Sequence, residues 1–224
     1  MGHIVELLTI TNVLTALTCW ISYQAFNDRS MKGKMLFLPK SINERNEFYR
    51  FFSSGFIHAN WLHLGFNMIA LYSFGNNVEL VFKLMFGMMP GSILYIALYF
   101  MGMVAASLPD YAKHKNHSGY RALGASGAVS AVVFVNILFE PWRLMMFPPL
   151  PQIIVGIGFL FYSSYMAKNE VQDGIGHSAH YYGALFGILF ISLFQPLVFT
   201  NFLECTFTYN KECLNDLFMK LFSK

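Results

Sequence analysis

The sequence predicts an all-α membrane protein in which six helices cross the bilayer as one bundle. The 224 residues are 55% hydrophobic and only 12% charged, which is about half the charged fraction usual in soluble proteins. Six segments also contain the roughly 20 mostly apolar residues that a membrane-crossing helix needs. Helices are expected because backbone groups that face lipid must satisfy their hydrogen bonds internally.

Polar connections separate the expected spans, which together define one domain over residues 1–200. The spans cover about 4–26, 58–80, 85–108, 122–140, 149–167 and 177–200. The connections include a long polar stretch at 27–57, a short break near Glu79 to Lys83, and a loop at about 109–120. The first apolar stretch lacks a basic n-region, so we do not interpret it as a removable signal peptide.

Residues 201–224 form a tail with its own pattern. Apolar residues repeat there with helical spacing, at Leu214, Leu217, Phe218, Leu221 and Phe222, and lysines lie nearby at Lys211, Lys220 and Lys224. This pattern predicts an amphipathic helix. Such a helix either lies on the membrane surface or packs on the loops of the bundle.

Charge and cysteine content exclude several classes of function. A net charge of +3 that is scattered along the chain makes nucleic acid an unsuitable partner. Cys19, Cys205 and Cys213 make neither a disulfide framework nor a C-x-x-C metal site. The zinc-protease pattern H-E-x-x-H is missing although the chain has seven histidines. We therefore predict no metal and no cofactor.

Unusual polar residues gather where the second, fourth and sixth expected spans begin. Alternate spans run in the same direction, so these three starts lie at one face of the membrane. The residues are His58, His63 and Asn67 in the second span, Ser126 in the fourth, and His177 and His180 in the sixth. Polar and ionisable side chains inside a span are costly and usually mark function.

Ser126 and His180 suggest nucleophilic catalysis. A serine hydroxyl is a weak nucleophile until a base takes its proton, and histidine is the usual base. The two residues lie at similar depth in parallel spans, so a Ser-His dyad is geometrically feasible. Asp173 lies in the preceding loop, and no third group that would orient His180 is evident, which favours a dyad over a triad.

A serine nucleophile also needs donors for the oxyanion that forms on the substrate. His63 and Asn67 are four residues apart and therefore point from the same helix face. The backbone N–H of Ser126, at a helix start, is a further candidate donor.

Three more residues belong to the expected site. Gly124 and Gly127 would allow a tight turn and an open approach for substrate, and His58 is close enough in sequence to join the polar cluster. Each of these features also has a structural interpretation. A lone G-x-S-G in a membrane helix is usually a packing motif, and a lone His58 is more often a hydrogen-bonded residue at an interface. His177 is likewise best interpreted as structural.

The pair Gly183 and Gly187 forms a G-x-x-x-G motif, which indicates close helix packing rather than chemistry. We expect it to bring the sixth span against the Gly127, Ala128 and Ala131 side of the fourth. A transporter or channel would explain the intramembrane histidines and asparagine, but not a serine between glycines at matching depth.

Taken together, these motifs resemble one family, the rhomboid intramembrane serine proteases. The matching stretches are YRFFSSGFIHANWLHLGFNMIALYSFG (49–75), GASGAVSA (124–131) and AHYYGALFG (179–187). Their order and spacing agree with that family over about residues 4–200. The resemblance implies a basic six-helix rhomboid fold that cleaves transmembrane segments of other membrane proteins.

The resemblance also implies a role for individual residues. Ser126 is similar to the family nucleophile and His180 to its general base, while His63, Asn67 and the Ser126 backbone match the oxyanion hole. Arg50 matches an arginine that holds the shape of the first loop, although the aromatic before it is Tyr49 rather than Trp.

One departure from the family concerns the catalytic histidine. Some members have an aromatic residue four positions after the serine that packs on this histidine, whereas this chain has Ser130 there. The orientation of His180 must therefore come from elsewhere, with Tyr181 and Tyr182 as candidates.

A second departure concerns orientation. The resemblance implies a multi-pass protein of a bacterial-type plasma membrane, with its site open to the extracytoplasmic side and with lipids and transmembrane substrates as partners. Lys and Arg are more frequent on that side of the chain, at Arg29, Lys32, Lys34, Lys40, Arg45, Arg50, Lys113, Lys115, Arg121 and Lys168. The opposite side has only Lys83, Arg143, Lys211, Lys220 and Lys224. The positive-inside rule favours the reverse orientation.

The competing hypothesis is a catalytically silent relative that binds transmembrane helices. Such proteins usually lack the serine or the histidine, and this chain has both. No oligomeric state is predicted.

Overall fold

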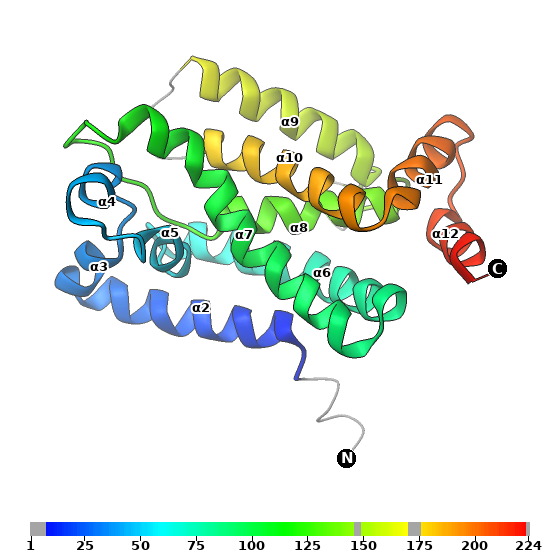
Figure 1. Ribbon diagram of the computed structural model, residues 1–224, viewed down its shortest axis with the longest axis horizontal. Coiled ribbons are helices and arrows are strands. Elements are labelled where there is room, and N and C mark those ends of the chain that lie inside the picture. The colour runs from blue at the N-terminus through cyan, green and yellow to red at the C-terminus, as the bar shows by residue number, and fades with distance from the viewer. Residues whose placement is uncertain (1–7, 146–148, 170–175, 223–224) are drawn as a thin grey trace.

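The computed structural model describes residues 8–145, 149–169 and 176–222. Its regular elements are helices (Figure 1), and its two β-contacts, Phe37 with Ala122 and Leu144 with Pro151, are isolated bridges. The all-α fold is therefore confirmed for the part of the chain that the structure describes.

Helices occupy each of the segments expected to cross the membrane. They are α2 (Ile10–Asn27), α6 (Trp61–Phe86), α7 (Met88–His114), α8 (Ser126–Phe139), α9 (Gln152–Lys168) and α10 (His177–Phe194). Residues 4–7 of the first expected span lie outside the described residues. Of the described helices, only α7 has by itself the length and hydropathy of a membrane span, and α10 does so together with the following helix α11 (Pro196–Phe207). The count of six spans therefore stays a prediction.

The short polar break expected near Glu79 to Lys83 is wrong, because α6 continues through it to Phe86. Glu79 is buried and accepts hydrogen bonds from the backbone N–H groups of Ile10 and Thr11 at 3.0 and 2.8 Å, and Lys83 pairs with it one turn later. The carboxylate thus binds the N-terminus of α2, whose first N–H groups lack intrahelical acceptors. Gly87, with φ of 90°, makes the turn into α7 instead.

Other boundaries also differ from the prediction, and two of them by more than a turn of helix. α7 continues past Pro109 to His114, so the loop expected at 109–120 begins later. The span expected at 177–200 ends at Phe194, and α11 leaves it at an angle of 114°. Pro196 explains this break, because proline has no N–H to donate and disfavours helical geometry in the residue before it. That residue, Gln195, has non-helical backbone angles, with φ of −145° and ψ of 83°.

The C-terminal tail packs on the bundle. Helix α12 (Cys213–Phe222) follows α11, and its Leu217 is buried against the main core. The predicted boundary at residue 200 falls inside α11. Cys205 and Cys213 are joined in a disulfide with their Cα atoms 5.6 Å apart, which corrects the expectation that the cysteines form no such bond. The turn between α11 and α12 brings the two together, which the spacing alone did not indicate.

Helix α8 is the centre of the molecule. Figure 1 shows it among α6, α7, α9 and α10, and every residue from Gly127 to Phe139 except Val133 is buried. Its closest neighbour is α10. A Cβ at Gly183 would collide with the backbone carbonyl of Gly127, and a Cβ at Gly187 with that of Ala131. The two glycines therefore let α10 approach α8 as the G-x-x-x-G motif predicts.

The long connection at 27–57 is itself folded. It contains α3 (Arg29–Met35), α4 (Pro39–Arg45), α5 (Arg50–Ser53) and the 3₁₀ turn η1 (Ser54–Phe56). This connection lies beside the segment that leads into α8, with Phe37 and Ala122 exchanging backbone hydrogen bonds of 3.0 and 3.1 Å.

Candidate active site

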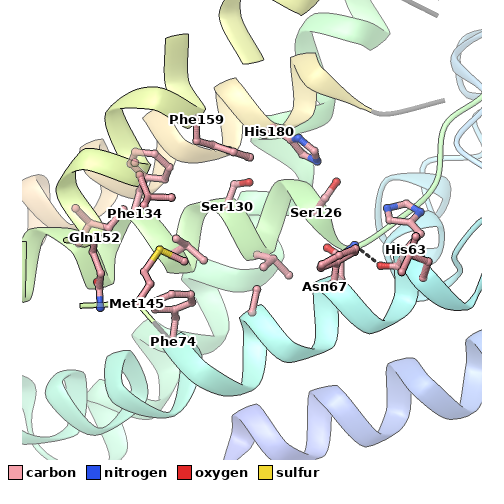
Figure 2. Close-up of a pocket in the computed structure, with 18 of the residues that line it drawn as sticks. His63, Asn67, Phe74, Ser126, Ser130, Phe134, Met145, Gln152, Phe159 and His180 are labelled. Carbon is pink, nitrogen blue, oxygen red and sulfur yellow. Dashed lines mark hydrogen bonds between the residues drawn. The ribbon is translucent and has the colours of Figure 1, made fainter. Parts of the chain in front are cut away.

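A cavity of about 540 Å³ lies between α6, α8, α9 and α10. Its lining is mostly apolar, with a few polar side chains: Asn60, His63, Asn67, Ser126, Ser130, Gln152 and His180. Figure 2 shows that His63, Asn67, Ser126 and His180 lie toward one end and Gln152 at the other. The cavity thus brings together the four residues on which the sequence-based dyad and oxyanion hole depend.

Ser126 is the first residue of α8, and its hydroxyl points toward the ring of His180 in Figure 2. Because Ser126 begins the helix, its backbone N–H has no intrahelical acceptor. Two residues earlier, Gly124 has φ of 118°, a conformation that side chains rarely adopt. This glycine forms the sharp turn that positions Ser126 at the cavity.

His180 faces the cavity from the first turns of α10. The ring of Phe159 on α9 stacks on it, with ring centroids 5.4 Å apart and an interplanar angle of 29°. Tyr181 and Tyr182 contact each other instead. Phe159 therefore provides the aromatic contact that Ser130 cannot make from α8.

His177, the other histidine at the start of the sixth expected span, lies beside His180. His177 is buried and packs edge-on against Tyr162 and against His180, with centroids 5.4 and 6.2 Å apart. Asp173 lies outside the described residues.

His63 and Asn67 face Ser126 from the first turns of α6. Asn60 caps this helix by accepting a hydrogen bond from the His63 N–H at 2.8 Å. One amide hydrogen of Asn67 goes to the His63 carbonyl at 2.9 Å, which orients the side chain along the cavity wall (Figure 2). The His63 ring lies directly against Gly124, where a Cβ would be 2.7 Å from its Cε1 atom.

His58 is fully buried and does not line the cavity. Its Nε2 accepts a hydrogen bond from the Ala125 N–H at 3.3 Å, so its proton must be on Nδ1, which lies 2.9 Å from the Ser22 hydroxyl oxygen. Ser22 in turn donates to the Phe56 carbonyl. The ring therefore connects α2 and the first loop to the residue before Ser126.

Arg50 acts on the same loop. Its guanidinium is buried and donates to the carbonyls of Lys34 and Leu36 at 2.7 and 2.8 Å, and it pairs with Glu47. These carbonyls lie just before Phe37, whose backbone bonds to Ala122. The loop is thus held together at the point where it contacts the approach to Ser126.

Gly127 contributes to packing as well as to the site. A Cβ at this position would be 2.5 Å from the Cβ of Ala106 on α7. The residue therefore lets α7 and α8 approach closely directly after the serine.

Most of the cavity lining was not anticipated from the sequence, including two residues beside the polar groups. Phe159 and Gln152 both lie on α9, a helix with no polar motif to draw attention to it. Within the described residues, no group of three or more His, Cys, Asp or Glu side chains is placed to hold a metal ion.

Comparison with known proteins identifies the family. A family model for the Rhomboid domain matches residues 45–196. The chain is 28% identical over 189 residues to Rhomboid protease GlpG of Haemophilus influenzae, covering 80% of this chain and 88% of the relative.

Two relatives come from Arabidopsis thaliana. The chain is 28% identical over 177 residues to the mitochondrial RHOMBOID-like protein 12, covering 74% of this chain. It is 26% identical over 196 residues to the chloroplastic Rhomboid-like protein 11, covering 81% of this chain. The matches span only 52% and 63% of the lengths of these two relatives. Because the family model covers more than half of the sequence, the chain belongs to the rhomboid family, whose members are integral membrane proteins.

Proposed function

We propose that this protein is an intramembrane serine endopeptidase that cleaves transmembrane segments of other membrane proteins. The observation that carries the proposal is the common cavity, which Ser126 and His180 face from adjacent helices while His63 and Asn67 lie opposite. The similarity to a relative named as a rhomboid protease supports the same activity.

The chemistry requires only side chains of this chain and water. The Ser126 oxygen attacks the carbonyl carbon of the scissile peptide bond while His180 removes the hydroxyl proton. The tetrahedral intermediate collapses, the C–N bond breaks, and His180 gives the proton to the leaving amine. Water, deprotonated by His180, then hydrolyses the Ser126 ester and restores the hydroxyl. No metal or cofactor takes part.

The oxyanion of each tetrahedral intermediate lies on the side of Ser126 that faces α6. The Ser126 N–H, the second amide hydrogen of Asn67 and a ring N–H of His63 are the available donors there. The loss of one such donor lowers kcat by about 10²–10³ in enzymes where this has been measured. We therefore assign His63 and Asn67 to transition-state stabilisation rather than to proton transfer.

The lining of the cavity favours an apolar substrate. Side chains such as Phe74, Val133 and Ile137 continue the cavity away from Ser126. A transmembrane segment matches this surface, whereas a charged or soluble peptide would lose solvation without gaining partners. Other membrane proteins and lipids are therefore the proposed partners, and nucleic acid is not.

The proposed location is a membrane, with the cavity open at the face where α6, α8 and α10 begin. The family resemblance favours the extracytoplasmic side of a bacterial-type plasma membrane for that face, while two relatives are named as mitochondrial and chloroplastic. The Lys and Arg distribution favours the opposite orientation. The Cys205–Cys213 disulfide lies in the C-terminal tail, and disulfides persist in oxidising compartments. It therefore also favours this reverse orientation, in which the tail is extracytoplasmic.

A cleavage assay in proteoliposomes tests the proposed activity. The protein is reconstituted with a transmembrane substrate that carries small residues near one end of its span. We expect the natural sequence to cleave it and both Ser126→Ala and His180→Ala to be inactive. Ser192→Ala, which removes a hydroxyl bonded to the Ile188 carbonyl on α10, is the matched control and retains activity.

Two results would count against the proposal. Cleavage by Ser126→Ala at the rate of the natural sequence would refute the assigned nucleophile. Binding of the transmembrane peptide without any cleavage would favour the catalytically silent alternative.

A further inference from the structure

The end of the cavity remote from Ser126 contains a buried polar side chain that the proposed chemistry does not use. Gln152, at the start of α9, is only 3% exposed yet lines the cavity, where Figure 2 shows it far from His63. Polar groups buried in a membrane bundle normally have hydrogen-bond partners or mark a substrate path.

A chain of amides fixes the direction in which Gln152 presents its hydrogens. The carboxylate of Glu140 only accepts, so the Asn77 side chain, 2.9 Å away, must turn its Nδ2 toward it. The same Nδ2 donates to Asn136 Oδ1 at 2.7 Å. Asn136 therefore presents its Nδ2 to Gln152 Oε1, 2.8 Å away.

The Nε2 atom of Gln152 is therefore the last donor in this series of hydrogen-bonded amides. Among the described residues, the Gln152 side chain makes no hydrogen bond other than that of its Oε1 atom to Asn136. The Oε1 atom of Gln152 accepts the hydrogen bond from Asn136. If the Gln152 amide flipped, its NH₂ group would face the NH₂ group of Asn136, so this orientation is fixed. The far end of this mostly apolar cavity therefore has a hydrogen-bond donor in a fixed orientation.

We propose that Gln152 is a specificity-determining residue that donates a hydrogen bond to a free acceptor oxygen in the membrane-embedded part of the substrate. The inference rests on the proposed binding of transmembrane segments, but not on their cleavage. A regular helix has no free carbonyl oxygen along its middle, so the acceptor is either a polar side chain, such as Asn, or a carbonyl that proline has released.

The position of this acceptor follows from the helix geometry. Asn136, which holds Gln152, lies ten residues after Ser126 on α8. At 1.5 Å per residue, this is about 15 Å along the helix axis. A helical substrate would therefore place its acceptor about ten residues from the scissile bond, on the membrane-embedded side.

A double-mutant binding cycle tests the inference without requiring activity. Ser126→Ala protein in lipid nanodiscs is titrated with fluorescent Leu/Ala transmembrane peptides that carry one Asn at successive positions. We expect Asn near the tenth position to tighten binding about three- to tenfold relative to the all-apolar peptide, as measured for hydrogen bonds between membrane helices. Adding Gln152→Met, which keeps the length of the side chain but has no donor, should abolish this gain.

Two controls complete the cycle. Asn76→Leu removes a half-buried amide on α6 that bonds to Asn12 and Tyr72 and does not line the cavity, so the gain should persist. A peptide with proline in place of Asn frees a backbone carbonyl, and a gain with proline alone would assign the acceptor to the backbone.

The inference is overturned if no peptide position shows a gain, or if the gain survives Gln152→Met. Either result would leave the proposed protease activity intact, because that activity is tested by cleavage. Conversely, a protein that never cleaves but shows the Gln152-dependent gain would retain the inference and lose the proposed activity.

Discussion

His58 Nε2 accepts a hydrogen bond of 3.3 Å from the backbone N–H of Ala125, the residue before Ser126. Gly124 N–H bonds to the Ser54 carbonyl at 2.9 Å, and Ala122 bonds to Phe37. Three contacts with the first loop and its end, at Ala122, Gly124 and Ala125, therefore hold the segment that positions the serine. This loop is remote in sequence from Ser126, yet it determines where α8 begins.

We expect His58→Phe to destabilise the protein and to slow cleavage by lowering kcat. The change leaves the buried Ala125 N–H without an acceptor, which should lower the free energy of unfolding by about 1–3 kcal/mol. Thermal unfolding in detergent and cleavage kinetics measure the two effects. His117→Phe, at an exposed position, is the control and should leave both near those of the natural sequence. Equal stability of the two variants would contradict the role of His58.

Phe159 should act through His180. Phe159→Ala removes the stacked ring and lets the imidazole rotate away from Ser126, so kcat/KM should fall about ten- to hundredfold, in keeping with the sensitivity of catalysis to small displacements. Phe159→Tyr keeps the ring and should restore most of the activity. Phe161→Ala removes an exposed ring on the same helix and should have no effect. If Phe159→Tyr were as inactive as Phe159→Ala, stacking of the ring on His180 would not be the cause of the lost activity.

Close packing of α8 and α10 should be sensitive to single methyl groups. In Gly183→Ala and Gly187→Ala, the new methyl group would collide with the backbone of α8 and push α10 away from it. We expect each change to lower the free energy of unfolding by about 1–3 kcal/mol and to separate His180 from Ser126. Gly158→Ala adds the same methyl group on α9, where nothing lies within 4 Å of the new Cβ. Its stability should be unchanged or slightly higher. Similar unfolding temperatures for all three variants would refute the packing argument.

Cysteine chemistry separates the two membrane orientations. In a Cys19→Ser background, an impermeant thiol reagent is applied to intact cells with and without an impermeant reductant. The disulfide together with the Lys and Arg distribution predicts labelling of Cys205 and Cys213 only after reduction. Labelling that also requires membrane permeabilisation would place the tail inside, as the family resemblance implies. Labelling without reductant would show that the two thiols are free.

Much of the site could be predicted from the sequence because its residues carry local signals. Ser126 lies between glycines, His63 and Asn67 share a helix face, and His180 precedes a G-x-x-x-G motif. Parallel spans then place these signals at one depth. The structure agrees with this arrangement in that all four residues line one cavity.

The rest depends on contacts between distant residues. Phe159 contacts His180 from another helix, and helical periodicity does not say which face of α9 meets α10. Glu79 looked like part of a polar break because its partners, Ile10 and Thr11, are far away in sequence. The bend at Pro196 did have a local signal, since proline ends helices, but hydropathy alone extended the span past it.

Labelling with a fluorophosphonate probe tests the central claim most directly, because the probe reacts only with a serine whose hydroxyl is activated. We expect that the natural sequence is labelled, that peptide mapping places the adduct on Ser126, and that Ser126→Ala and His180→Ala are not labelled. Labelling of Ser126→Ala equal to that of the natural sequence, or an adduct on another serine, would contradict it.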